Sequence, residues 1–356
     1  MVGFKHRMLE DIYAQPDAIA ETLRRNQGAV ERVVEEFFSE EVKLIYLSGS
    51  GTSYHAGLAS QLILSSLARL PATAIPASEF AAWTPSIMGE GFYLIAVSQS
   101  GESRDVLEAV RDARKKGVKI LAITNTPGST LTKLADETLL TYAGEEVAVT
   151  ATKTFTSQLS LLYLLSLQMA LKRGFEPDRL KALLRSLYAV PDLLRGNMKE
   201  MEDECSFLAE LYKDKNVYFV LGSGPNYATA LEGALKLKEA CNVFSEGFAT
   251  REFLHGPVQL VNEKTAVMLI LFKTELEEVR RLVKSFKGYG APVIAVSNDA
   301  SVGDELKVET LSFKGDAPPY ISPMVYAAPL QLYAYFTSIY RGLNPDKPEK
   351  LSKVVR

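Results

Sequence analysis

The chain has 356 residues, enough for two domains of ordinary size, and its 47% hydrophobic and 23% charged residues are typical of a soluble globular protein. The net charge of −3 argues against a broad nucleic-acid-binding surface, and no segment approaches the ~20 apolar residues that a membrane helix needs. Two cysteines exclude a disulfide framework, and three dispersed histidines lack zinc-ligand spacing. We therefore expect a cytoplasmic protein that acts on a small molecule, without nucleic acid or membrane as partner.

An internal repeat organises the chain. Residues 46–54 (YLSGSGTSY) resemble residues 219–227 (FVLGSGPNY) at an offset of 173 residues, and the same offset aligns 117–125 with 290–298. Two matches at one offset predict two copies of one unit. In chain order, the predicted parts are a helical arm interrupted by Pro16 (1–29), a first copy (30–175), a helical linker broken at Pro191 (176–204), a second copy (205–340) and an irregular tail (341–356).

Each copy is predicted to alternate strands and helices. The apolar runs KLIYLSG and NVYFVLG both end at Gly-Ser-Gly, as buried parallel strands end at a turn. The segment SRDVLEAVRDARKKG places Val106, Leu107, Val110 and Ala113 on one helical face. This pattern predicts an α/β fold with two tandem flavodoxin-like domains, each a parallel sheet in a three-layer αβα arrangement. Ligands of such sheets bind beyond the carboxyl ends of the strands, at helix N-termini.

A serine-rich loop, residues 98–103 (SQSGES), lies where a predicted strand ends and a helix begins. A turn with an N-cap would explain it, but the second copy has LFKTEL at the equivalent positions, so the fold does not require the hydroxyl groups. Hydroxyls, free backbone N–H groups and a helix dipole together suit a phosphate dianion. Thr52 and Ser53 open a second helix of this kind. The sequence lacks a P-loop motif, which argues against nucleotide hydrolysis.

The second copy carries different polar residues. Glu232, Lys236 and Glu239 are spaced to share one face of a helix. Such spacing usually indicates a row of solvent-exposed ion pairs along a helix. The apolar neighbours of these residues indicate instead that the helix is packed. His255 precedes Gly-Pro and is, taken alone, typical of a structural histidine.

Eight segments, in this order, resemble the sugar isomerase (SIS) domain family. They are DIYAQPDAI (11–19), GTSYHAG (51–57), SQSGES (98–103), NTPGSTL (125–131), VTATKTFTSQ (149–158), ALEGALKLKE (230–239), REFLHGP (251–257) and LSKVV (351–355). The likeness is strongest to the two-domain isomerase module of glucosamine-6-phosphate synthases and to the related sugar-phosphate deaminases and deglycases. It implies two SIS domains and no metal or cofactor.

The resemblance also implies a role for each matching residue. Glu239 corresponds to the base that moves a proton between C1 and C2 of an open-chain sugar, and Lys236 to a lysine that contacts the reacting hydroxyls. His255 corresponds to a residue that assists ring opening in a neighbouring subunit, which implies a homodimer with shared sites. Lys353 corresponds to a tail lysine that forms an imine with the keto sugar. The implied phosphate-binding and pocket-lining residues are Thr52, Ser98, Gln99, Ser100 and Ser103, Ser53 with less weight, and Val149 and Thr150 through their backbones.

The sequence departs from the synthases in two ways. Their amidotransferase domain, with an N-terminal cysteine nucleophile, has no counterpart here, and residues 149–152 read VTAT where the synthases have VAST. Without its own ammonia supply, the chain is expected to be a deaminase that converts glucosamine 6-phosphate and water to fructose 6-phosphate and ammonia. The alternatives are a fructosamine-6-phosphate deglycase, a galactosamine-6-phosphate deaminase, a synthase isomerase subunit with a separate glutaminase, and a non-catalytic sugar-phosphate sensor.

Overall fold

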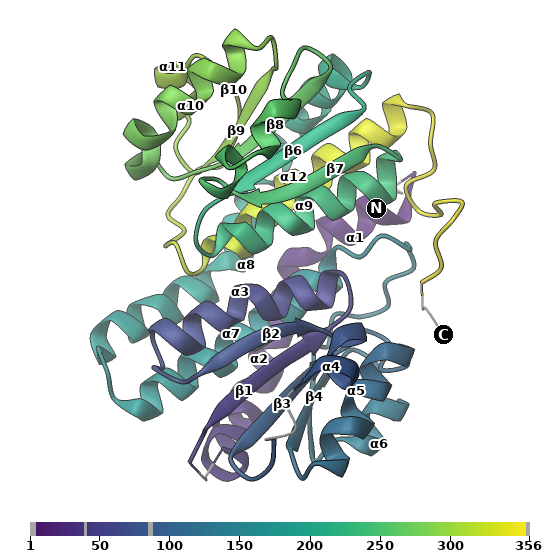
Figure 1. The fold of residues 1–356 in the computed structure, drawn as a ribbon, viewed down its shortest axis with the longest axis vertical. Coiled ribbons are helices and arrows are strands. Elements are labelled where there is room, and N and C mark those ends of the chain that lie inside the picture. Colours follow the sequence, from purple (N-terminus) through teal and green to yellow (C-terminus); the bar gives the residue numbers. More distant parts are fainter. Residues whose placement is uncertain (1–4, 39–40, 85–87, 354–356) are drawn as a thin grey trace. The chain divides into compact units, whose positions relative to one another are not determined.

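The computed structural model describes residues 5–38, 41–84 and 88–353, and it divides the chain into two compact units, each built on one sheet (Figure 1). We call them the N-sheet unit and the C-sheet unit. The N-sheet unit comprises the described residues of 14–146, 151–191 and 352–353. The C-sheet unit comprises those of 5–13, 147–150 and 192–351.

The N-sheet unit contains five parallel strands in the order β2-β1-β3-β4-β5. Their bounds are β1 (Leu44–Gly49), β2 (Ala72–Pro76), β3 (Phe92–Val97), β4 (Lys119–Thr124) and β5 (Glu137–Leu140). Ile45 pairs with Tyr93 across the β1–β3 boundary, where the strand order reverses. In a doubly wound sheet this reversal opens a crevice at the carboxyl ends of the strands.

Helices cover both faces of this sheet. On one side lie α2 (Gln15–Arg32), α3 (Thr52–Ser66) and α7 (Lys153–Arg173), and on the other α4 (Ala77–Trp83), α5 (Arg104–Lys115) and α6 (Thr130–Leu134) (Figure 1). A short π-helical turn, η1 (Val33–Phe37), follows α2. Leu94 and Ala96 of β3 face α5, where Val106 and Val110 are buried against them. The apolar face predicted for this helix is therefore its packing face.

The C-sheet unit repeats the same plan with the order β10-β9-β8-β6-β7. Its strands are β6 (Val217–Gly222), β7 (Phe244–Ala249), β8 (Thr265–Ile270), β9 (Val293–Ser297) and β10 (Glu309–Ser312). Its helices are α1 (Arg7–Tyr13), α9 (Asn226–Cys241), α10 (Leu276–Gly288), α11 (Ser301–Leu306) and α12 (Ser322–Tyr340), with 3₁₀ turns η2 (Glu252–Leu254), η3 (Pro257–Leu260) and η4 (Lys273–Glu275). Helix α9 packs between β6, β7 and α12, while α10 and α11 cover the other face.

The strands fall at the spacing that the repeat predicts. Strands β1 and β6 lie 173 residues apart, as do β3 and β8. Each sheet has the flavodoxin-like order in which the second strand of the copy forms one edge. The expected α/β fold with two parallel, three-layer copies is confirmed.

Two proline positions differ from the sequence expectation. The arm breaks at Ala14 between α1 and α2, and Pro16 lies in the first turn of α2, where its missing N–H group is harmless. The linker is a single helix, α8 (Pro177–Tyr212), which keeps Pro191 inside it, so the predicted break was wrong. A proline removes one hydrogen bond of a helix. The flanking turns, which bury Leu187 and Leu194, carry the helix past it.

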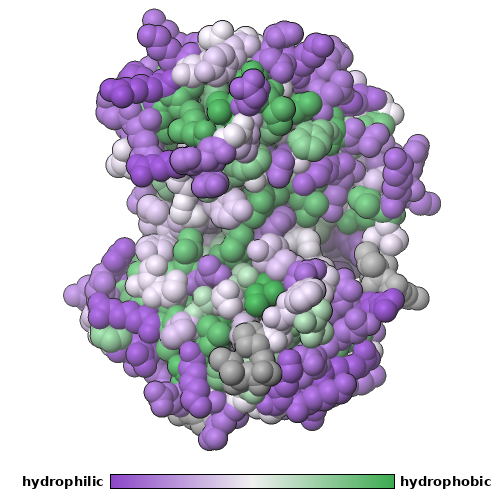
Figure 2. Space-filling view, in the orientation of Figure 1, coloured by the Kyte–Doolittle hydropathy of each residue, from purple (hydrophilic) through white to green (hydrophobic). Residues whose placement is uncertain are grey.

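The surface in Figure 2 is mostly hydrophilic, with apolar residues showing in patches among the charged ones. The largest fully buried side chains lie on the strands, as Tyr93 and Phe219 do, and on the helices that cover them, as Phe155 and Tyr333 do. None of the helices in residues 5–38, 41–84 and 88–353 combines the length and apolar character needed to cross a bilayer.

Gly101 of the serine loop is predicted to tolerate no side chain. Its φ is +65°, and a Cβ would lie 2.1 Å from Ser129 Oγ. Gly117 has a similar φ of +75° with nothing within 4 Å of the added Cβ. We expect Gly117→Ala to cost about 1 kcal/mol for the left-handed backbone alone, and Gly101→Ala to cost about 1–3 kcal/mol more through overpacking. Urea denaturation of both variants measures this difference, and equal losses would contradict the steric argument.

Candidate active site

The serine loop, residues 98–103, connects β3 to α5 beside the crevice where the strand order reverses. Its backbone is tied to the loop after β4, since Gln99 O accepts hydrogen bonds from Thr124 Oγ1 (3.1 Å), Asn125 N (3.0 Å) and Thr126 Oγ1 (3.2 Å). Glu102 Oε1 adds a bond from Thr130 N at 2.7 Å. The loop is therefore held rigidly before any ligand binds.

The hydroxyl groups of the loop shape its turn and keep protons to donate. Ser98 Oγ accepts from Gly101 N and Ser100 Oγ accepts from Glu102 N, each at 3.1 Å. A hydroxyl that accepts can still donate its own hydrogen. Ser103 is the N-cap residue of α5, and its side chain makes no capping bond. Serine hydroxyls thus converge on a helix N-terminus that an anion could cap.

Thr52 and Ser53 begin α3, directly after β1 and Gly51. Thr52 is half-buried, while Ser53 is buried and its Oγ lies 3.1 Å from Gln158 Oε1 of α7. The Ser53 hydroxyl is therefore used to join α3 to α7.

A cavity of about 680 Å³ in the N-sheet unit brings several predicted residues together. Gln99 and Ser100 line it from the serine loop, and Lys353 lines it from the C-terminal tail. Lys353 Nζ lies 2.8 Å from Oε2 of Glu146, which is fully buried and lines the same cavity. Sequence reasoning missed Glu146, because adjacent glutamates at 145 and 146 in a loop look like solvated residues and the contact joins positions 207 residues apart.

Val149 and Thr150, also predicted to line a pocket, belong to the C-sheet unit. The Val149 N–H donates to Asp346 O at 3.0 Å, so this N–H group is already used within the protein. Thr150 is fully buried, and its Oγ1 has no hydrogen-bond partner among the described residues. Of the backbone contacts that the family resemblance implies, the one from Val149 would therefore rest on its carbonyl group.

Helix α9 carries the predicted Glu232–Lys236–Glu239 face into the interior. Lys236 is fully buried, and its Nζ lies 3.2 Å from Glu232 Oε1 and 2.6 Å from Glu239 Oε2. The Glu239 side chain is 22% exposed, whereas that of Glu232 is buried. The three residues therefore form a packed ionic cluster and not a solvated stripe, as the apolar neighbours on α9 suggested.

The charge of Lys236 is fixed by its two partners. Burial alone lowers the pKa of this amine, but the carboxylates of Glu232 and Glu239 outweigh burial and raise the pKa above its ordinary value. A buried, permanently charged ammonium can stabilise negative charge that develops on a nearby oxygen. Because only Glu239 reaches solvent, it is the member of the cluster that can exchange a proton with a ligand.

His255 lies on an exposed turn between η2 and η3. Its backbone N–H donates to Glu252 O at 3.0 Å, and its imidazole has no hydrogen-bond partner among the described residues. Among the described residues, only the backbone of its own turn thus positions the imidazole ring. An exposed histidine is free to serve a site outside its own turn, as the resemblance implies.

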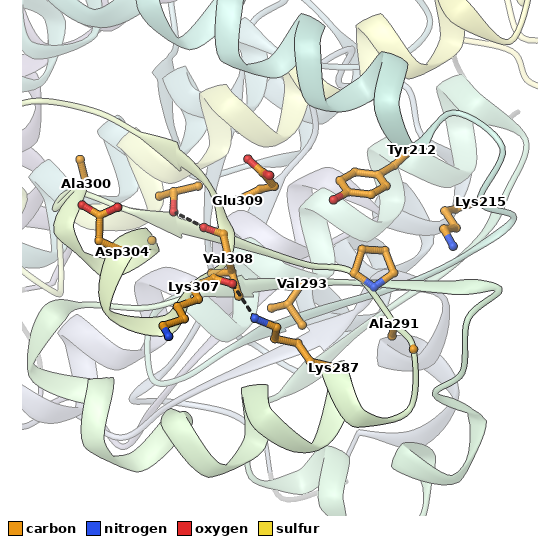
Figure 3. Close-up of a pocket in the computed structure, with 14 residues that line it drawn as sticks. Tyr212, Lys215, Lys287, Ala291, Val293, Ala300, Asp304, Lys307, Val308 and Glu309 are labelled. Carbon is orange, nitrogen blue, oxygen red and sulfur yellow. Dashed lines mark hydrogen bonds between the residues drawn. The ribbon is translucent and has the colours of Figure 1, made fainter.

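A larger cavity, about 770 Å³, lies elsewhere in the C-sheet unit (Figure 3). Tyr212, Lys287 and Lys307 border it, close to the residues that begin β9 and β10. This is the amino-terminal edge of the sheet, opposite the edge at which parallel α/β sheets bind ligands. It holds none of the predicted site residues. Size alone therefore does not make it the active site.

The comparisons with known proteins identify the family of the chain. The family model of the SIS domain matches residues 40–168 and 210–339. The chain belongs to the SIS domain family. Each matched segment contains one of the two sheets, so the resemblance inferred from the sequence motifs is confirmed.

Individual relatives share nearly the full length of the chain. Glutamine–fructose-6-phosphate aminotransferase (isomerizing) of Caldanaerobacter subterraneus is 35% identical over 361 aligned residues, which cover 99% of this chain and 59% of the relative. The structure of the C-terminal domain of glucosamine-fructose-6-phosphate aminotransferase from Francisella tularensis has a TM-score of 0.90 and 29% identity, covering 97% of this chain and 99% of that one. The glucosamine-6-phosphate deaminase structure from Thermotoga maritima has a TM-score of 0.78 and 25% identity, covering 98% and 99%. The chain thus spans less than three-fifths of the curated aminotransferases that it matches.

Loss of the Lys236 ammonium should strongly destabilise the C-sheet unit. Lys236→Met leaves two carboxylates at the buried cluster without their cation, and we expect a cost of about 3–5 kcal/mol at pH 7. A raised lysine pKa means that this contribution is fully present below pH 10.5 and is lost only as the pH rises above it. Urea denaturation at pH 7 measures the loss. Lys238→Met, at an exposed position of the same helix, is the control and should stay within about 0.5 kcal/mol of the parent.

Proposed function

We propose that this chain is the isomerase part of an aminotransferase that makes glucosamine 6-phosphate from fructose 6-phosphate, with ammonia supplied by a protein segment outside residues 1–356. The carrying observation is the buried Lys236 of α9 with Glu239 at 2.6 Å, which pairs a fixed cation with a carboxylate that can exchange a proton. Aminotransferases that are 35–38% identical over 99% of the chain support the assignment.

The deaminase expected from the sequence uses the same steps in the opposite direction. Its structural counterpart from Thermotoga maritima is 25% identical, against 37% for the aminotransferase of Thermococcus kodakarensis. The relatives therefore favour amino-sugar synthesis over release of ammonia.

The serine loop is proposed to bind the phosphate of the substrate. Its hydroxyl donors converge on the N-terminus of α5, whose dipole favours a dianion. The proposed ligands are Thr52, Ser98, Gln99, Ser100 and Ser103, with Ser53 holding α3 to α7 and with Val149 and Thr150 contacting the sugar through their backbones. Binding energy from this remote group orients the reacting carbons.

The residues of α9 are proposed to carry out the proton transfer. His255 assists opening of the sugar ring, and the amine of Lys353 condenses with the C2 carbonyl group, whose oxygen leaves as water. Ammonia then displaces the lysine amine to give the C2 imine of the sugar. Glu239 takes a proton from C1 and returns it to C2, which converts the ketose imine to the amino aldose. Lys236 stabilises the oxygen on C1 as charge builds on it. Lys353 is proposed to hold the keto sugar as an imine before ammonia displaces it.

The activity test uses the purified chain with three substrate mixtures. Fructose 6-phosphate with ammonium chloride should give glucosamine 6-phosphate, and fructose 6-phosphate alone should give glucose 6-phosphate by the same proton transfer. Glucosamine 6-phosphate alone measures the deaminase direction. Release of ammonia without either synthesis reaction would favour the deaminase instead. Binding without turnover of any substrate, including fructosamine 6-phosphates and galactosamine 6-phosphate, would identify a sensor.

Removal of the proposed base should abolish turnover without abolishing binding. Glu239→Gln keeps the shape of the side chain and leaves Lys236 paired with Glu232, so we expect kcat to fall at least ~100-fold with little change in KM. Steady-state kinetics with fructose 6-phosphate measure both constants. Glu246→Gln removes an exposed glutamate of the same unit and is the matched control. A KM effect alone would assign Glu239 to binding.

The predicted sharing of sites between subunits can be tested by complementation. We expect Glu239→Gln and His255→Ala chains to be inactive alone and to regain activity after they are mixed and allowed to exchange subunits. If each active site takes Glu239 from one subunit and His255 from the other, a mixed dimer has one intact site. Sedimentation of the mixture confirms exchange. An inactive mixture of exchanged subunits would place both residues in one chain.

A further inference from the structure

Glu146 is an unusual residue for a loop because its carboxylate is completely enclosed. The side chain has no exposed surface, yet five hydrogen-bond donors reach it. Oε1 accepts from Thr152 N at 2.8 Å, from Thr154 N at 3.2 Å and from Thr152 Oγ1 at 3.5 Å. Oε2 accepts from Thr154 Oγ1 at 2.6 Å and from Lys353 Nζ at 2.8 Å. The loop thus buries a carboxylate with its hydrogen-bonding capacity used.

Four of these donors lie at the start of a long helix. Thr152 is the N-cap residue of α7, which runs for 21 residues to Arg173, and Thr154 lies in its first turn. The N-terminal end of a helix attracts negative charge through its unpaired N–H groups and its dipole. Burial opposes ionisation of Glu146, but Lys353 and the helix donors together hold its pKa below the ordinary value. Glu146 is therefore a charged carboxylate that the N-terminal end of α7 holds in place.

The fifth donor comes from a segment with no regular structure of its own. Residues 341–353 contain neither helix nor strand, and the side chains of Lys347 and Lys350 in this tail are exposed. Lys353 is only partly exposed, at 27%, and its ammonium lies against Glu146 on the wall of the cavity that Gln99 and Ser100 also line. A rigid anion thus faces a cation on a segment that lacks helix or strand.

We propose that Glu146 is the positioning residue that docks the C-terminal tail by its lysine, so that Lys353 stands at the cavity lined by the serine loop. This inference deepens the proposed function, on which the use of Lys353 toward a keto sugar rests. The Glu146–Lys353 contact itself does not depend on any reaction. The Glu146 carboxylate binds one lysine of the tail, Lys353. This contact determines where the amine of Lys353 would meet a ligand.

The unmodified protein provides the first test. Brief treatment with a trace of acetic anhydride, followed by peptide mass spectrometry, measures the reactivity of each tail lysine. Lys353 should react about fivefold more slowly than Lys350, which is exposed and precedes it by three residues in the same tail. Equal reactivity of the two lysines would overturn the proposal, and no variant has to fold for this result to be read.

A pair of matched variants locates the cause of the protection. Glu146→Gln keeps an oxygen for the N–H groups of Thr152 and Thr154 and removes only the charge that faces Lys353. We expect Lys353 to become as reactive as Lys350. Glu145→Gln removes one negative charge from an exposed neighbour that lines the same cavity, and should leave the protection of Lys353 intact. Protection that persists in Glu146→Gln would contradict the assignment.

Kinetics separate positioning from a merely structural role. Glu146→Gln should lower kcat for fructose 6-phosphate about tenfold with little effect on KM, and should add no further loss in a Lys353→Met background. An equal additional loss in that background would show that Glu146 acts independently of Lys353. If the parent protein is inactive but Lys353 is protected through Glu146, the proposed function fails and the docking contact stands. If the parent protein is active but Lys353 is not protected, the docking contact fails and the proposed function stands.

Discussion

The chemistry proposed for this protein depends on one buried ammonium. Lys236 is fully enclosed and keeps its charge only because Glu232 and Glu239 lie within 3.2 Å of it. An isolated charge at this depth would be costly, whereas a charge with two carboxylates at hydrogen-bond distance can be retained. Helix α9 provides this geometry directly, since residues at i, i+4 and i+7 share a face. The same pairing leaves Glu239 at the margin of the cluster, partly exposed and close to a cation.

The duplicated fold gives two equivalent places for such chemistry and uses them differently. In the first copy, Ser100 lies in a loop whose hydroxyl groups surround the N-terminus of α5. The equivalent residue of the second copy is Lys273, whose Nζ lies 3.1 Å from Asp299 Oδ2 and 2.8 Å from Ser301 Oγ. The second loop therefore satisfies its own charge, while the first leaves donors for an anion. In the proposed function, the first copy binds the phosphate at this helix N-terminus, and the second copy supplies the reacting groups from α9.

Local patterns in the sequence were sufficient to predict much of the fold. The strand positions, the apolar face of α5 and the two copies follow from hydrophobic periodicity and a constant offset, which are properties of neighbouring residues. The helix break expected at Pro191 failed because packing on both sides of a proline can sustain a helix that local rules would end. Glu146 was missed for the opposite reason. Its environment is created by a helix start six residues later and a lysine 207 residues away, and neither is visible in the loop itself.

The direction of the reaction does not follow from the arrangement of the side chains, because the same groups serve both directions. In the proposed mechanism, Glu239 moves a proton between C1 and C2 whether the nitrogen is arriving or leaving, and Lys236 stabilises the same oxygen in both cases. Synthesis would then differ from release only in the local concentration of ammonia. The two SIS domains account for a sugar-phosphate isomerase in either direction. The likeness to aminotransferases over 99% of the chain, and over less than three-fifths of their length, is therefore a likeness in the isomerase chemistry, which the two directions share.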